Sequence, residues 1–326
     1  MGNVGTPRSA IPEVRLSSGH KMPQIGLGTG AASLPPPQAL TAILIEAIEM
    51  GYRHFDTAAV YGSEECLGRA VAEALERRLI RSRDEVFITS KLWCNNADPD
   101  LVLPALKETL RRLGLEYVDL YLIHWPVRMK RETEGLNFTK ESLLEFDVKG
   151  TWEAMEECSK LGLAKSIGVS NFGPKKLSQI LQFCSIPPAV NQVEMNVAWK
   201  QEKLREYCRD KGIHASAWSP LASNGSSWGS MAVMESPILK SIAEARGTTV
   251  AQVALRWVHE QGSTAIVKSF NKERMRDNLR ILEWDEPLTE DELEKIRQIP
   301  PCQGVRGDVF VNENGPGYTS VDELWE

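Results

Sequence analysis

Eight short apolar runs alternate with longer helical patterns along this chain, and this alternation limits its fold more than any other feature. Repeated strand and helix units predict a parallel sheet, and eight strands suffice to close such a sheet into a barrel. We therefore expect an α/β fold, a (β/α)8 TIM barrel. The expected strands are residues 25–28, 52–56, 86–91, 118–124, 164–169, 189–194, 213–218 and 264–268, and the expected helices are 38–50, 64–78, 99–113, 150–162, 174–183, 201–211, 237–246 and 250–261.

Three segments outside this repeat are expected at the ends of the barrel. Two short strand patterns within residues 14–23 predict an N-terminal β-hairpin that closes one end. The connections 125–149, after the fourth strand, and 219–236, after the seventh, are too long for simple loops and are expected to be functional.

The two termini are interpreted differently. Residues 1–12 are expected to form a disordered tail, and residues 13–326 a single domain. A capping threonine and two acidic residues predict a last helix at 289–299. The C-terminal segment 300–326 is rich in Gly and Asn, so we expect it to be irregular and to lie over the reactive face of the barrel.

Charge and hydropathy exclude two classes of partner from the prediction. Acidic residues outnumber basic ones by 44 to 38, for a net charge of −6, which argues against nucleic acid as the main partner. The longest apolar stretches have the length of strands, so no membrane span is expected. We expect the protein to be a monomer and its partner to be a small-molecule substrate.

The cysteines and the N-terminus bear on localisation. The six cysteines have no CxxC or CxxH spacing and no apolar leader precedes them, so we interpret them as free thiols in the cytoplasm. Residues 1–6 fit a myristoylation pattern, although the pattern is short and a single acyl chain anchors a protein only marginally.

Three successive expected strands end in side chains that can carry proton chemistry. Asp56 ends the second strand, Lys91 the third and His124 the fourth, and Tyr61 lies five residues after Asp56. The carboxyl ends of the strands form the reactive face of a β/α barrel. A phenol with an ordinary pKa of about 10 becomes a useful acid when a cation lies beside it. These four residues are the predicted catalytic site.

One apparent nucleotide-binding motif is interpreted as accidental. Residues 26–31 match the GxGxxA dinucleotide fingerprint. That fingerprint must lead directly into a helix, whereas here three prolines at 35–37 follow it.

Three motifs give the chain a resemblance to the aldo-keto reductase superfamily. They are GYRHFDTA and the residues after it at 51–68, KSIGVSNF at 165–172, and IVKS with the residues after it at 266–279. The resemblance covers about residues 14 to 300. Residues 149–158 and 190–196 resemble the plant branch, which includes codeinone reductase, methylecgonone reductase, chalcone (polyketide) reductase, galacturonate reductase and deoxymugineic acid synthase.

This resemblance implies roles for the four catalytic candidates. Tyr61 would be the general acid that protonates the carbonyl oxygen while hydride reaches the carbon. Lys91, paired with Asp56, would lower the pKa of the phenol, and His124 would orient the carbonyl and share its developing charge. Related enzymes that reduce carbon–carbon double bonds carry glutamate in place of this histidine, so His124 favours carbonyl reduction.

The resemblance also implies NADPH/NADP+ as the cofactor. Trp218 replaces the tyrosine that commonly stacks on the nicotinamide ring in the family. Lys268 and Arg274 would face the 2′-phosphate, which favours NADPH over NADH. The expected cofactor-binding residues are Gly28, Thr29, Asp56, Ser170, Asn171, Gln192, Trp218, Ser219, Leu221, Lys268, Ser269, Phe270, Asn271, Arg274 and Asn278.

Tryptophans are the expected walls of the substrate pocket, together with His124. Trp93 and Trp125 follow strand ends, and Trp199 and Trp228 are assigned to the long loops. These tryptophans could instead cap the barrel core. An aromatic pocket would favour flat or apolar carbonyl compounds.

The leading prediction is therefore an NADPH-dependent reductase of an aldehyde or ketone in plant specialised metabolism. Two alternatives remain open. A chalcone-type reductase would act on a polyketide intermediate only beside a partner synthase. A non-enzymatic binding subunit, such as the potassium-channel β-subunits, would use the same scaffold without turnover.

Overall fold

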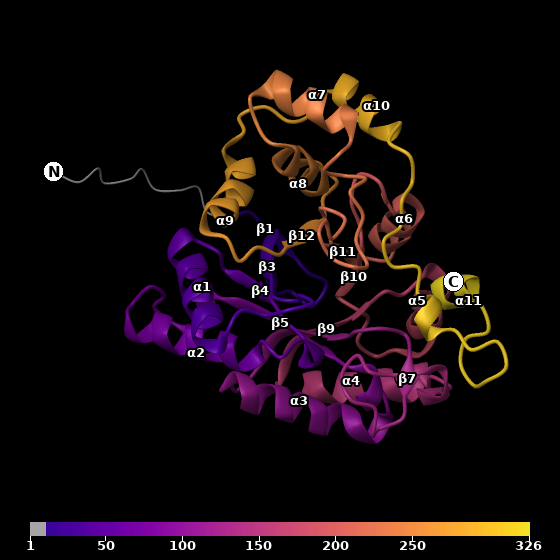
Figure 1. Ribbon diagram of the computed structural model, residues 1–326. Coiled ribbons are helices and arrows are strands. Elements are labelled where there is room, and N and C mark those ends of the chain that lie inside the picture. The colour runs from indigo at the N-terminus through magenta and orange to yellow at the C-terminus, as the bar shows by residue number, and fades with distance from the viewer. Residues whose placement is uncertain (1–10) are drawn as a thin grey trace.

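The predicted barrel is present in the computed structural model, which describes residues 11–326. Within these residues eight parallel strands form a closed barrel in the order β10-β11-β12-β3-β4-β5-β6-β9 (Figure 1). The fold prediction is thus confirmed. The barrel strands are β3 (Ile25–Gly28), β4 (His54–Asp56), β5 (Phe87–Leu92), β6 (Val118–Ile123), β9 (Ala164–Ser170), β10 (Val190–Glu194), β11 (His214–Trp218) and β12 (Thr264–Val267).

Helices surround the barrel (Figure 1). They are α1 (Pro37–Met50), α2 (Glu64–Glu76), α3 (Pro99–Leu113), α4 (Val148–Lys160), α5 (Pro174–Phe183), α6 (Glu202–Asp210), α7 (Pro237–Arg246), α8 (Val250–Glu260), α9 (Lys272–Leu279) and α10 (Glu290–Arg297). Helix α9 was not predicted, because its sequence is mostly charged and lacks a clear apolar period. Thr289 caps α10 as expected. None of the helices within residues 11–326 combines the length and the apolar character that crossing a membrane requires.

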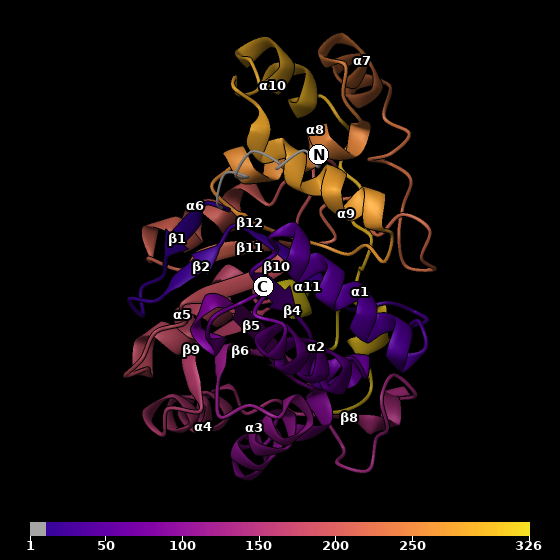
Figure 2. The same cartoon turned by 90° about the vertical axis from the view of Figure 1, so that its left-hand side faces the viewer.

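The N-terminal hairpin closes one end of the barrel (Figure 2). Strands β1 (Glu13–Arg15) and β2 (Lys21–Pro23) pair antiparallel. Leu16 and Met22 pack against residues at the start of several barrel strands, among them Phe87 and Val190. The hairpin prediction is confirmed.

Two residues of the predicted disordered tail 1–12 pack against the barrel instead. Residues 1–10, and with them the myristoylation pattern, lie outside the described part of the chain. Ile11 packs against the main core, and the Pro12 carbonyl accepts a hydrogen bond of 2.8 Å from the Gln24 amide. These two residues therefore belong to the fold.

The long connections and the C-terminal segment gather at the opposite end of the barrel (Figure 2). The first connection contains the short strands β7 (Arg128–Met129) and β8 (Leu143–Leu144). The C-terminal segment crosses the strand ends, since the Tyr318 hydroxyl donates to the Pro126 carbonyl at 2.6 Å. The segment is not irregular throughout, because it ends in helix α11 (Val321–Trp325), which Ser320 caps.

Candidate active site

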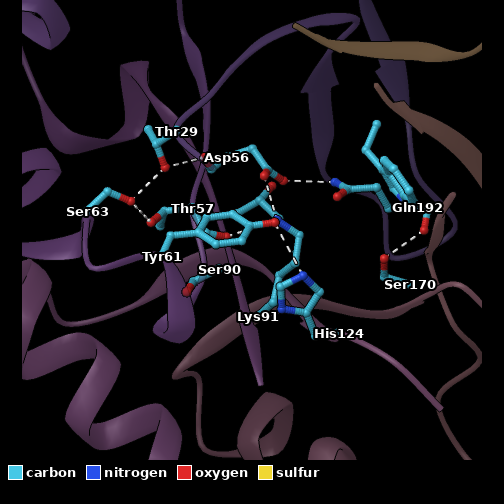
Figure 3. A network of polar contacts seen from close by, with 12 residues as sticks. Thr29, Asp56, Thr57, Tyr61, Ser63, Ser90, Lys91, His124, Ser170 and Gln192 are labelled. Carbon is cyan, nitrogen blue, oxygen red and sulfur yellow. Dashed lines mark hydrogen bonds and ion pairs between the residues drawn. The ribbon is translucent and has the colours of Figure 1, made fainter. Parts of the chain in front are cut away.

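The four predicted catalytic residues meet at the carboxyl ends of neighbouring strands (Figure 3). Asp56 is the last residue of β4, Lys91 lies one residue before the end of β5, and His124 directly follows β6. Tyr61 ends a 3-10 helix, Ala59–Tyr61, which brings its ring back over the barrel mouth. Asp56 and Lys91 are buried, at 3% and 1% exposure, whereas Tyr61 is partly exposed.

The contacts of this cluster fix the ammonium of Lys91. Its Nζ donates to Asp56 Oδ1 at 2.5 Å and to the Thr57 carbonyl at 3.0 Å. An ammonium has three hydrogens, so one remains for the side of Tyr61, whose ring centroid lies 5.0 Å from Nζ. The Tyr61 hydroxyl lies 3.2 Å from His124 Nε2 (Figure 3).

Burial and charge set the protonation states of these groups. Burial raises the pKa of Tyr61, and the positive charge of Lys91 opposes that rise. Burial, with the nearby Lys91 charge, holds the pKa of His124 well below its usual value, so the imidazole is neutral. Burial lowers the pKa of the Lys91 ammonium, but the charges of Asp56 and Tyr61 and the hydrogen bonds to both together raise it above its usual value. The cluster therefore presents a protonated phenol, a cation and a neutral imidazole at one point.

A buried hydroxyl network supports the loop that carries Asp56 and Thr57, and sequence reasoning did not identify it. Ser63 Oγ lies 2.7 Å from Thr29 Oγ1 and 2.8 Å from Thr57 Oγ1 (Figure 3). Thr29 in turn donates to the Asp56 carbonyl at 3.0 Å. The position of Ser63 before α2 suggests a helix cap, yet its side chain makes no cap hydrogen bond. The network positions the carbonyl that Lys91 binds.

The residues predicted to hold the nicotinamide form a connected group. Gln192 Nε2 donates to Asp56 Oδ2 at 2.8 Å, which links this group to the catalytic cluster. Asn171 has a left-handed backbone, with φ of 65°, and its side-chain Nδ2 donates to the His124 carbonyl at 2.9 Å. The indole of Trp218 donates to Asn171 Oδ1 at 2.9 Å, and Ser170 donates to the Gln192 carbonyl at 2.7 Å.

The residues predicted for the other end of the cofactor lie around the start of α9. Lys268 and Arg274 are exposed, and neither forms an ion pair with another residue of the described range 11–326. Asn271 caps the helix by accepting from the Arg274 amide at 2.9 Å. The remaining predicted cofactor-binding residues, at either end, are buried or partly buried, namely Gly28, Thr29, Ser219, Leu221, Ser269, Phe270 and Asn278.

Two of the four predicted pocket tryptophans join an aromatic cluster above the catalytic residues. The Trp93 ring lies 5.1 Å from that of His124, and Trp125 lies 4.6 Å from Phe310 of the C-terminal segment. Trp199 and Trp228 are not part of this cluster.

The assignment of Trp199 to a long loop was wrong. It lies in the short connection between β10 and α6, within a turn closed by Asn196. Trp228 does lie in the connection 219–236, where 39% of it is exposed.

The fold and this cluster place the chain among β/α-barrel proteins whose polar groups meet at the carboxyl ends of the strands. The chain belongs to the aldo/keto reductase family, whose model matches residues 24–300. Among similar proteins, Protein REDOX 2 of Catharanthus roseus is 54% identical over 317 residues, which cover 97% of each chain. Rhazimal reductase 2 of Alstonia scholaris is 56% identical over 317 residues, with 97% of each chain covered.

Solved structures agree with this assignment. The crystal structure of a Bombyx mori aldo-keto reductase in complex with NADP superposes with a TM-score of 0.84 at 34% identity, over 96% of this chain and 100% of that one. The aldose reductase of Schistosoma japonicum gives a TM-score of 0.83 at 32% identity, over 92% of this chain and 96% of that one.

Proposed function

We propose that the chain is an oxidoreductase that uses NADPH to reduce an aldehyde or ketone to an alcohol. The observation that carries the proposal is the position of the Tyr61 hydroxyl, which lies 3.2 Å from a neutral His124 and beside the fixed cation of Lys91. A carbonyl oxygen placed between the phenol and the imidazole would meet two hydrogen-bond donors at once. This arrangement supports proton donation to a developing alkoxide.

The roles of the side chains follow from their protonation states. Tyr61 keeps its proton until the substrate oxygen gains negative charge, because burial disfavours the free phenolate. After transfer the ammonium of Lys91 stabilises the phenolate, and Asp56 holds that ammonium in place. The neutral imidazole of His124 orients the carbonyl. Solvent returns a proton to Tyr61 at the end of the cycle.

Two exposed cations of the chain suit the binding of NADPH, which supplies the hydride when bound. Lys268 and Arg274 are exposed cations at the start of α9, where the helix N-terminus also favours an anion. The neighbour from Bombyx mori is described in complex with NADP. Ser170, Asn171, Gln192 and Trp218 are proposed to hold the nicotinamide.

The proposed setting is plant specialised metabolism. A further relative, deoxymugineic acid synthase 1-A of Triticum aestivum, is 54% identical over 305 residues, 94% of this chain and 96% of that protein. The name of rhazimal reductase 2 supports a reduction, and the two relatives are named for different compounds, so their names leave the substrate open.

We also propose a monomer in the cytoplasm. All six cysteines are free thiols, which fits a reducing compartment. Light scattering after size-exclusion chromatography, and imaging of a fluorescent fusion, test these two points.

Replacement of Tyr61 by Phe tests the proposed reaction. Loss of the proposed proton donor should lower kcat for carbonyl reduction by about a hundredfold or more. NADPH binding, followed by fluorescence, should change less than about twofold because the ring remains. Tyr207→Phe, on α6, is the matched control and should leave both quantities unchanged.

Three outcomes separate this proposal from its alternatives. A Tyr61→Phe variant that keeps most of its kcat contradicts the proton-donor role. Activity that appears only when a polyketide synthase is present favours the chalcone-type reading. Absence of turnover across sugars, uronic acids, alkaloid ketones and aromatic aldehydes favours a binding subunit.

A further inference from the structure

Glu194 is a buried carboxylate at the barrel mouth that the proposed reaction does not use. It is the last residue of β10 and only 2% of it is exposed. It lies two residues after Gln192, and its strand neighbour in β11 is Trp218. Within residues 11–326 it forms no ion pair with a lysine or arginine.

The partners of this carboxylate are two consecutive amides of the C-terminal segment. Oε1 accepts from the Gly304 amide at 2.9 Å, and Oε2 accepts from the Val305 amide at 3.0 Å. Burial of a carboxylate is costly unless hydrogen bonds compensate it, and bonds to a charged acceptor are stronger than neutral ones. Burial raises the pKa of Glu194, and these two amides act in the opposite direction.

Residue 304 must be small for this contact to form. A Cβ at Gly304 would lie 2.7 Å from Glu194 Oε1 and 3.1 Å from the Trp228 carbonyl. The connection 219–236 therefore meets the C-terminal segment at the same point. The carboxylate joins strand β10 to the C-terminal segment, and the long connection lies beside the segment at Gly304.

The residues that follow this contact form a wall of the aromatic cluster. Val305 packs against the cluster that contains Trp93 and Trp125. Phe310 lies 4.6 Å from Trp125 and stacks on Phe138 at 5.5 Å between ring centroids. Fixing residues 304 and 305 thus fixes where this wall begins, above Tyr61 and His124.

We propose that Glu194 is a positioning residue for the substrate, which acts by holding Gly304 and Val305 and thereby the pocket wall formed by residues 305–310. The proposal rests on the carbonyl reduction proposed above. Glu194 takes no part in proton transfer, since its carboxylate is occupied by the two amides. Its loss should weaken substrate binding and leave the chemistry intact.

Glu194→Gln is the first test, because it keeps the shape of the side chain and replaces one acceptor by an amide donor. Steady-state kinetics with NADPH and benzaldehyde should show a rise of about tenfold in KM, the loss expected for one charged hydrogen bond, with kcat within about threefold of wild type. NADPH affinity, measured by fluorescence, should stay within about twofold. Glu202→Gln, an exposed residue at the start of α6, is the matched control and should change none of these quantities.

Gly304→Ala tests the same contact from the other side. The added methyl group must displace the carboxylate or the segment, so this variant should reproduce the rise in KM. The double variant should show about the same KM as either single variant, because both remove one interaction. An unchanged KM in both single variants, a double variant whose KM rise is the product of the two, or a parallel loss of kcat and NADPH affinity, would overturn the proposal.

Hydrogen exchange gives a readout that does not depend on activity. The amides of Gly304 and Val305 should exchange at least about tenfold faster in Glu194→Gln than in wild type, whereas those of β10 should not change. Equal exchange in the two proteins overturns the proposal even if the enzyme is active. A wild type without carbonyl turnover, combined with faster exchange in the variant, contradicts the proposed function and leaves the structural role of Glu194 supported.

Discussion

Lys268 and Arg274 differ from Lys91 because their charges are not paired with a carboxylate of the described chain. The ammonium of Lys91 is buried and committed to Asp56, whereas both residues near α9 are exposed and form no ion pair within residues 11–326. A cation without an ion-pair partner can bind a ligand anion without first breaking an ion pair. The 2′-phosphate that distinguishes NADPH from NADH is such an anion.

Replacement of Arg274 by Ala should therefore discriminate between the two cofactors. We expect KM for NADPH to rise by about tenfold or more, the effect of one charge-assisted hydrogen bond, and KM for NADH to change less than about twofold. Arg276→Ala is the matched control, since Arg276 is exposed on the same helix. Steady-state kinetics with both cofactors make the measurement, and equal changes in the two KM values would remove the 2′-phosphate argument.

Residues at strand ends were predictable, and residues that support them were not. Asp56, Lys91 and His124 each end an apolar run, so the barrel pattern alone brings them together. Ser63 carries no such signal. Glu194 ends the expected strand 189–194, yet the sequence does not reveal its partners, because these depend on how the C-terminal segment returns over the barrel. The contact from Glu194 to Gly304, for example, spans 110 positions.

At the level of elements, helices α2 and α3 pack at a distance that only glycine allows. A Cβ at Gly68 in α2 would lie 2.1 Å from the carbonyl oxygen of Leu113, the last residue of α3. That oxygen belongs to the backbone, so it cannot rotate away as a side chain can. Helix α2 also begins with Glu64, directly after Ser63. Ser63 bonds to Thr29, and Glu64 accepts a hydrogen bond from Ser90, both near the catalytic cluster.

Gly68→Ala should destabilise the protein even though alanine favours helices. The gain in helix propensity is about 1 kcal/mol, and overpacking of a close contact costs about 1–3 kcal/mol, with the upper range expected here because backbone must move. Chemical denaturation should therefore give a free energy of unfolding lower by about 1–2 kcal/mol. Glu76→Ala, exposed on the same helix, should change it by less than about 0.5 kcal/mol. A Gly68→Ala variant as stable as wild type would mean that α2 and α3 separate freely.

Helix boundaries were predictable from the sequence where a capping residue marks the start or the end of the helix. Helix α3 begins after Asp98, with Pro99 in its first turn, and ends before Gly114, whose φ is 64°, as these residue types predict. Helices α9 and α11 were missed, because α9 is mostly charged and α11 has only five residues. Contacts hold α11 instead, among them the bond from Lys176 Nζ to the Glu323 carbonyl at 2.6 Å.

For the molecule as a whole, the barrel interior contains a histidine that must stay neutral. His54 is 1% exposed, and burial lowers its pKa to about 4. Its Nδ1 lies 3.1 Å from the Pro23 carbonyl, which can only accept, so Nδ1 carries the hydrogen. Its Nε2 then accepts from Thr89 Oγ1 at 3.0 Å. His54 thus links the N-terminal hairpin to the barrel through its neutral form.

This histidine should make the fold sensitive to acid. Well above a pH of about 6.5, His54 is neutral in the folded and the unfolded chain and adds no pH dependence to stability. As the pH falls from about 6.5 to about 4, the unfolded chain gains a proton that the folded chain lacks, so the free energy of unfolding falls. The loss from this residue should reach about 2 kcal/mol between a pH of about 7.5 and about 5. Chemical denaturation at a pH of about 7.5 and of about 5 measures this loss in wild type and in His54→Gln. The variant should lose about 2 kcal/mol less than wild type over this range. The exposed control His20→Gln should lose as much as wild type. Equal losses in wild type and His54→Gln would place the acid sensitivity in other groups.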